Sequence, residues 1–174
     1  MEKERYLFLD FDGVLNTMEY QTVLQWKGDP RKDMYGTLFD PCAIENLDLI
    51  IEHTAAKIII SSSWRLDGIK RIREMWSARG LPGEIYGVTP ELDQVCFISL
   101  EDKRNTISVI PYGTRGLEIN EWLRTNTNYN TCYSYAIIDD FDDFISSQMP
   151  HVILTEPETG LTKDVAEKAI IILQ

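Results

Sequence analysis

The sequence predicts an α/β fold of three layers, in which helices cover both faces of a mainly parallel central sheet. Short segments that are apolar at almost every position recur along the chain, as expected for strands that are buried on both faces. Segments with helical periodicity alternate with them, and this alternation favours parallel strands joined by right-handed crossovers. At 174 residues the chain is long enough to bury a substantial core, so we expect one domain over residues 1–174.

A polar segment separates the first expected strand, residues 6–9, from the first expected helix. Residues 17–39 are mixed and polar and contain glycine and proline breakers, so we expect an excursion over the site that is too short for an independent cap domain. Asp40 resembles a helix N-cap, and Pro41 suits the first helical position. The apolar stripe of this helix is Ile44, Leu47 and Ile51.

The middle of the chain repeats the strand and helix pattern. Residues 57–60 form the second expected strand, and the serine-rich segment 61–65 follows it. The next helix stops near Gly80, and residues 84–88 form a third short strand. One face of this helix carries Ile69, Ile72 and Trp76.

The last third of the chain contains its least regular segment, residues 89–114. Within it, residues 95–98 and 107–110 are predicted to form a hairpin. The other expected elements are a helix over 117–123, strands over 133–138 and 151–154, and a final helix capped by Thr162 that carries Val165, Ala169, Ile170 and Leu173.

Polar side chains follow three of the expected strands. In an open α/β sheet, ligands bind beyond the carboxyl ends of the strands, so these side chains are predicted to share one crevice. Carboxylates at the mouth of a core strand cost free energy unless a cation holds them, and a set of hard oxygen ligands favours Mg²⁺. Arg115 is a candidate to neutralise an anionic substrate, and this mixture of groups suits a phosphate ester. The polar groups are Asp10 and Asp12, Ser61 and Ser62, and Asp139 and Asp140.

These motifs resemble those of the haloacid-dehalogenase (HAD) superfamily of phosphohydrolases. The segment Asp10-Phe11-Asp12-Gly13-Val14-Leu15-Asn16 looks like its first motif, and Ser61 matches its second. Arg115 stands at the basic third motif, and Asp139-Asp140 with Asp143 resembles the acidic fourth. The segments around them are similar to the HAD domains described as Swiss-army-knife RNA-repair-like and to their stand-alone bacterial and phage relatives. The resemblance implies a Rossmann-like HAD fold with a minimal cap or none.

The resemblance also implies a role for each motif residue. Asp10 would be the nucleophile that forms an aspartyl-phosphate. Asp12 would protonate the leaving alcohol and then activate water, while its carbonyl oxygen joins Asp10 on Mg²⁺. Ser61 would donate a hydrogen bond to a phosphoryl oxygen, and Arg115 would stabilise the charge on the phosphate and the phospho-enzyme.

Several assignments within the site stay open at the level of sequence. The fourth motif fits in two registers, and we favour Asp140 as the direct metal ligand with Asp139 behind it. The third motif is usually Lys, so Lys103 and Arg104 compete with Arg115 for that role. Phe11, Ser62 and Arg65 are predicted to line the phosphate-binding pocket, although Ser62 alternatively caps the following helix and Arg65 has the alternative of a surface ion pair.

Other classes of protein carry some of these features. A calcium loop that began at Asp10 would need Gly at its sixth position and Glu at its twelfth, where this chain has Leu15 and Gln21. The DxD pair of glycosyltransferases leaves Ser61 unexplained. A receiver domain would carry its adjacent acidic pair after the first strand, whereas here that pair comes late. A catalytically silent scaffold that binds a partner through residues 89–114 has no use for the second acid, Asp12.

The composition of the chain limits the binding partners and the cellular location that we expect for it. The net charge of −11 disfavours tight non-specific binding to nucleic acid or to an anionic membrane. The chain starts with charged residues, has no apolar run of membrane length and has three widely spaced cysteines, so we expect a cytoplasmic protein with reduced thiols. The expected partner is a phosphorylated substrate, either a small molecule or a polynucleotide end, because a site without a large cap is open to bulky esters.

Overall fold

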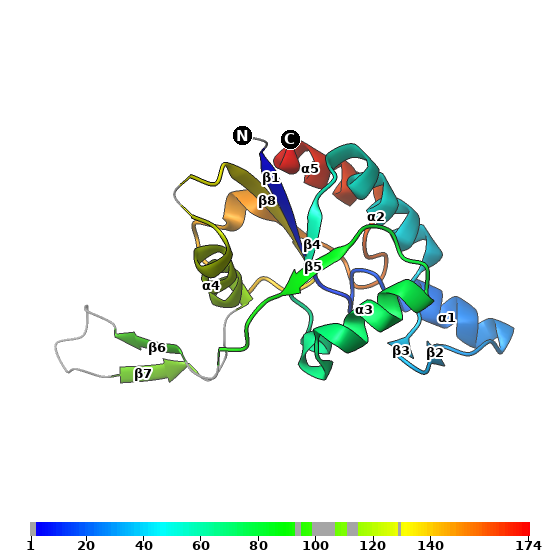
Figure 1. Cartoon of the computed structure of the whole chain (residues 1–174). Coiled ribbons are helices and arrows are strands. Elements are labelled where there is room, and N and C mark those ends of the chain that lie inside the picture. Colours follow the sequence, from blue (N-terminus) through cyan, green and yellow to red (C-terminus); the bar gives the residue numbers. More distant parts are fainter. Residues whose placement is uncertain (1–2, 93–94, 99–106, 111–114, 129) are drawn as a thin grey trace.

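The computed structural model describes residues 3–92, 95–98, 107–110, 115–128 and 130–174. Its centre is a five-stranded sheet in which every neighbouring pair is parallel (Figure 1). The order across the sheet is β5-β4-β1-β8-β9. The strands are β1 (Glu4–Leu9), β4 (Lys57–Ile60), β5 (Ile85–Val88), β8 (Tyr133–Asp139) and β9 (Val152–Leu154). This arrangement confirms the predicted parallel sheet and all five of its strands.

Helices cover both faces of the sheet, which gives the predicted three layers. On one face, α2 (Pro41–Thr54), α3 (Ile69–Ala78) and α5 (Lys163–Leu173) pack their apolar side chains against β1, β4 and β8. On the other face, α4 (Arg115–Asn126) packs Ile119, Trp122 and Leu123 over the alternate side chains of the same strands. Asp40 caps α2 by accepting from the Cys42 N–H, and Thr162 caps α5 by accepting from the Val165 N–H, as predicted.

The polar excursion contains a helix that the sequence pattern does not predict. Helix α1 (Met18–Lys27) is capped by Thr17 and ends at Gly28, whose φ of 72° is left-handed. Only Leu24 of this helix is buried, so its sequence carries no apolar stripe that could indicate a helix. The excursion ends in a small hairpin of β2 (Lys32–Asp33) and β3 (Gly36–Thr37).

A second hairpin interrupts the chain between β5 and α4. It consists of β6 (Val95–Ile98) and β7 (Ile107–Ile110), which pair antiparallel over the predicted residues. The competing basic residues Lys103 and Arg104 lie outside the described residues. None of the helices in the described part of the chain has both the length and the apolar composition that a membrane crossing requires.

Candidate active site

The site begins where β1 and β8 end side by side. The two strands are parallel, with Leu9 opposite Ile138, and the Asp10 N–H continues the ladder by donating to the Ile138 carbonyl oxygen at 3.1 Å. Asp10 and Asp139 therefore leave the sheet at the same level. The strand order changes direction between β1 and β8, and α/β proteins place their ligands at such a switch point.

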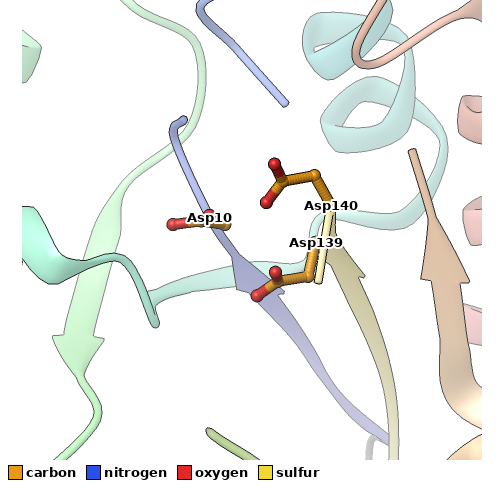
Figure 2. A group of neighbouring side chains, drawn as sticks. All are labelled: Asp10, Asp139 and Asp140. Atoms are coloured by element: carbon orange, nitrogen blue, oxygen red, sulfur yellow. The ribbon is translucent and has the colours of Figure 1, made fainter. Parts of the chain in front are cut away.

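Three carboxylates converge at this point: Asp10, Asp139 and Asp140 (Figure 2). One oxygen of each lies within 4.8 Å of the others. Asp10 and Asp139 are buried and Asp140 is half-buried. Burial and the negative charge of Asp10 raise the pKa of Asp139 to about 7, and the same two causes raise the pKa of Asp140. Within the described residues, the site therefore brings together more negative charge than the neighbouring cation, Arg115, neutralises.

Arg115 is the cation that faces this cluster. As the first residue of α4, it places Nη1 2.8 Å from Oδ2 of Asp139 and 3.0 Å from Oδ1 of Asp10. One guanidinium group is thus shared by two buried carboxylates. The Phe141 N–H donates to the remaining oxygen of Asp139 at 2.9 Å, so both oxygens of that carboxylate have partners.

Asp143 holds the start of α4 and does not join the acidic cluster. Its carboxylate accepts from the Arg115 N–H at 3.1 Å, and its carbonyl oxygen accepts from the Gly116 N–H at 2.9 Å. An acid at a helix N-terminus satisfies free N–H groups and complements the helix dipole. Of the two registers of the fourth motif, the structure therefore places Asp139 and Asp140 in the cluster and gives Asp143 the task of positioning Arg115.

The carboxylate of Asp12 points to two donors outside the cluster. Its Oδ1 accepts from Asn16 Nδ2 at 2.6 Å, and its Oδ2 accepts from Trp64 Nε1 at 3.0 Å. The sequence analysis missed both partners, although an amide four residues after an acid is a usable signal for a turn that closes on itself. The binding of a metal by the Asp12 carbonyl oxygen stays a prediction.

Phe11 and Gly13 shape the turn that carries these acids. The Phe11 side chain is fully buried among Phe39, Trp64 and Trp76, so only its backbone can reach a substrate. Gly13 has a left-handed φ of 68°, and a Cβ atom there would collide with the Asp140 carboxylate. Glycine at this position lets the turn lie against the cluster.

Ser61 follows β4 and lies beside Asp10. Leu9 pairs with Ile60, and the Ser61 N–H donates to the Leu9 carbonyl oxygen at 3.0 Å. Its hydroxyl group is buried and has no hydrogen-bond partner within the described residues. Ser62 is also buried, and its hydroxyl group accepts from the Trp64 N–H as the cap of the short 3-10 helix η1 (Ser63–Asp67). Contact of either serine with phosphate stays a prediction.

Arg65 belongs to a buried ion pair that the sequence analysis did not find. Its Nη2 lies 2.7 Å from both carboxylate oxygens of Glu118, and its Nη1 donates to the carbonyl oxygens of Ser61 and Ser62 at 3.1 and 3.0 Å. Burial raises the pKa of Glu118, and the charge of Arg65 opposes this effect. A glutamate on the buried face of α4, three residues after Arg115, was the available signal. Direct contact of Arg65 with phosphate stays a prediction.

The donor set at this site fits a hard divalent cation. It offers carboxylate oxygens from Asp10, Asp139 and Asp140, and Mg²⁺ and Ca²⁺ prefer such oxygens. The raised pKa values of Asp139 and Asp140 indicate that further positive charge would be stabilising here. The cluster can therefore hold a metal ion.

Comparison with known proteins yields one match. The family model described as the HAD domain in Swiss Army Knife RNA repair proteins covers residues 6–166. This range includes the cluster, Arg115, Ser61 and the Arg65–Glu118 pair. No curated protein and no solved structure matches the chain.

We predict that Asp140→Asn has opposite effects with and without metal. In metal-free protein at pH 8, the variant should raise the free energy of unfolding by about 1 kcal/mol, or ~3 °C in Tm, because it removes one charge from the cluster. The gain should vanish at low pH, where the parent carboxyl group is neutral as well. With saturating Mg²⁺, the parent should be stabilised and the variant much less so. Thermal unfolding with EDTA or Mg²⁺ measures both effects.

The exposed neighbour Asp142→Asn is the control for the Asp140→Asn variant. If Asp140→Asn responded to Mg²⁺ as strongly as the parent does, this would contradict the place of Asp140 in a metal-binding cluster.

We also predict that Gly13→Ala is more damaging than Gly28→Ala. Both glycines have left-handed φ angles, of 68° and 72°, so both variants lose about 1 kcal/mol to backbone strain. Only at Gly13 does the new methyl group meet another side chain, that of Asp140, whereas no atom lies within 4 Å of it at Gly28. Gly13→Ala should cost about 2–3 kcal/mol in urea denaturation and should weaken stabilisation by Mg²⁺. Equal losses for the two variants would argue against close packing of the turn on Asp140.

Proposed function

We propose that this chain, which belongs to the family of HAD domains in Swiss Army Knife RNA repair proteins, is a metal-dependent phosphohydrolase that cleaves a phosphate monoester. The observation that carries the proposal is the position of Asp10. It lies buried at the switch point of the sheet, next to two further carboxylates and in contact with Arg115. A positioned carboxylate beside fixed positive charge is the arrangement that nucleophilic attack on a phosphate ester requires.

In the first step we assign the attack on phosphorus to Asp10. Arg115 binds Oδ1 and leaves Oδ2 to form the new bond. The ester P–O bond breaks as the aspartyl-phosphate forms, and protonated Asp12 gives its proton to the leaving alcohol. Arg115 and the Ser61 hydroxyl group hold the equatorial phosphoryl oxygens.

In the second step Asp12 acts as a base. It removes a proton from water, the water oxygen bonds to phosphorus, and the acyl-phosphate bond breaks to release inorganic phosphate and the free Asp10 carboxylate. Two donors, Asn16 Nδ2 and Trp64 Nε1, hold the Asp12 carboxylate in position for this step.

Asp10 and Asp140 are the residues we assign as direct metal ligands, together with the Asp12 carbonyl oxygen. Both oxygens of Asp139 already accept hydrogen bonds, which supports a place for this residue behind Asp140. Mg²⁺, favoured by the oxygen-only donor set, would supply charge neutralisation for the phosphoryl group when bound.

The substrate we propose is a phosphorylated polynucleotide end, with a small phosphate ester as the alternative. The description of the matched family supports a nucleic-acid substrate. The net charge of −11 argues that recognition is confined to the terminal phosphate and its neighbours, because a long polyanion would be repelled. The strand order speaks against a receiver domain, since the sheet follows the 3-2-1-4-5 order and receivers follow 2-1-3-4-5.

We predict that purified protein hydrolyses p-nitrophenyl phosphate with Mg²⁺ and loses this activity in EDTA. Asp10→Asn and Asp12→Asn should each reduce kcat at least a hundredfold, because they remove the nucleophile and the acid–base group. Circular dichroism should show an unchanged fold, and Asp142→Asn should keep the parental rate.

The same assay, extended to oligonucleotides with 3′ or 5′ phosphates, separates the two substrate classes. A terminal phosphate released more efficiently from an oligonucleotide than from a mononucleotide would support a polynucleotide end. Full activity of Asp10→Asn would overturn the mechanism. Inertness of the parent towards every phosphate ester would favour the silent scaffold.

A further inference from the structure

The Arg65–Glu118 pair connects two parts of the site that are far apart in the sequence. Arg65 lies in η1, four residues after Ser61, whereas Glu118 lies on α4, three residues after Arg115. Positions three residues apart on a helix share a face, so Glu118 and Arg115 leave α4 on the same side. The pair therefore joins the loop that carries Ser61 to the helix that carries the site's cation.

The pair is buried, and its hydrogen bonds restrict the orientation of the Arg65 side chain. The side chains of Arg65 and Glu118 are only 10% and 6% exposed. Two carbonyl oxygens and one carboxylate fix the plane of the Arg65 guanidinium group through Nη1 and Nη2. A lysine could not make this set of bonds, because it presents a compact point charge in place of a planar fork.

Ser61 is the residue on which these contacts act. Its N–H is tied to the Leu9 carbonyl oxygen in β1, and its own carbonyl oxygen is tied to Arg65. Hydrogen bonds at its N–H and at its carbonyl oxygen thus hold the backbone from which a buried hydroxyl group projects, and that hydroxyl group has no partner among the described residues. Holding such a group ready costs free energy in the empty protein, which fits a group kept for a ligand.

We propose, on the premise of the phosphohydrolase function above, that Arg65 and Glu118 are positioning residues that hold the Ser61 hydroxyl group in place to bind the phosphoryl group. Glu118 orients Arg65, and Arg65 fixes the Ser61 carbonyl oxygen. Stability alone does not require this pair, because replacing a buried ion pair by apolar side chains of similar size is often neutral or stabilising.

The test is a double-mutant cycle between the pair and Ser61. Arg65→Met/Glu118→Leu removes the pair, and Ser61→Ala removes the hydroxyl group. We expect the pair variant to keep its fold and Tm while kcat/KM falls about tenfold to a hundredfold, as misplaced catalytic groups typically cause. In the Ser61→Ala background the same change should lower kcat/KM less than threefold. Arg65→Lys should resemble the pair variant, and the exposed pair on the same helix, Glu121→Gln/Arg124→Gln, is the control.

A second readout does not depend on turnover. Amide hydrogen exchange over residues 61–65 should accelerate at least tenfold in the pair variant, while exchange in β1 should not change. Unchanged exchange at 61–65, or an equal loss of kcat/KM with and without Ser61, would overturn the proposal. If the parent hydrolyses no phosphate ester, the proposed function fails, and the exchange measurement still decides whether the pair positions the loop.

Discussion

The site depends on one guanidinium group shared between two buried carboxylates. Arg115 lies about equally close to Asp10 and Asp139, at 3.0 and 2.8 Å. Without it, two ionised acids would be buried next to each other in a medium that stabilises charge poorly, at a cost of several kcal/mol. With it, both carboxylates have a cationic partner, while the third carboxylate, Asp140, adds further negative charge. The surrounding structure meets this constraint: Asp143 fixes the start of α4, and Gly13 makes room for Asp140.

Much of this fold can be predicted from the sequence, because strands that are buried on both faces consist mainly of apolar residues. Residues 58–60 and 136–138 are apolar because helices cover both faces of the sheet, and the alternation of such segments with helical stripes indicates the parallel order. Caps such as Asp40 and Thr162 are equally local signals. Helix α1 was missed because it buries little more than Leu24, so burial imposes no pattern on its sequence.

The part of the site that could be predicted consists of the residues at the ends of the strands. Asp10, Ser61 and Asp139 end neighbouring parallel strands, and their proximity follows from topology. The partners that orient these groups do not follow in the same way. Glu118 reaches Arg65, and Trp64 reaches Asp12, only through the tertiary packing of helices and turns, which no local spacing encodes. Phe11 shows the opposite case: it directly follows Asp10 in the motif, yet its side chain lies in the aromatic core and not at the site.

The central position of β1 in the sheet also affects the order in which strands can pair during synthesis of the chain. Its two neighbours in the sheet, β4 and β8, are built from residues 57–60 and 133–139, so β1 is synthesised well before its second neighbour. Until then one edge of β1, which is apolar from Tyr6 to Leu9, stays without hydrogen-bond partners, and the acidic cluster is incomplete. A nascent chain cut short before residue 139 would thus be both prone to aggregation and unable to assemble the carboxylate cluster. In this topology the three carboxylates come together only when β8 takes its place beside β1.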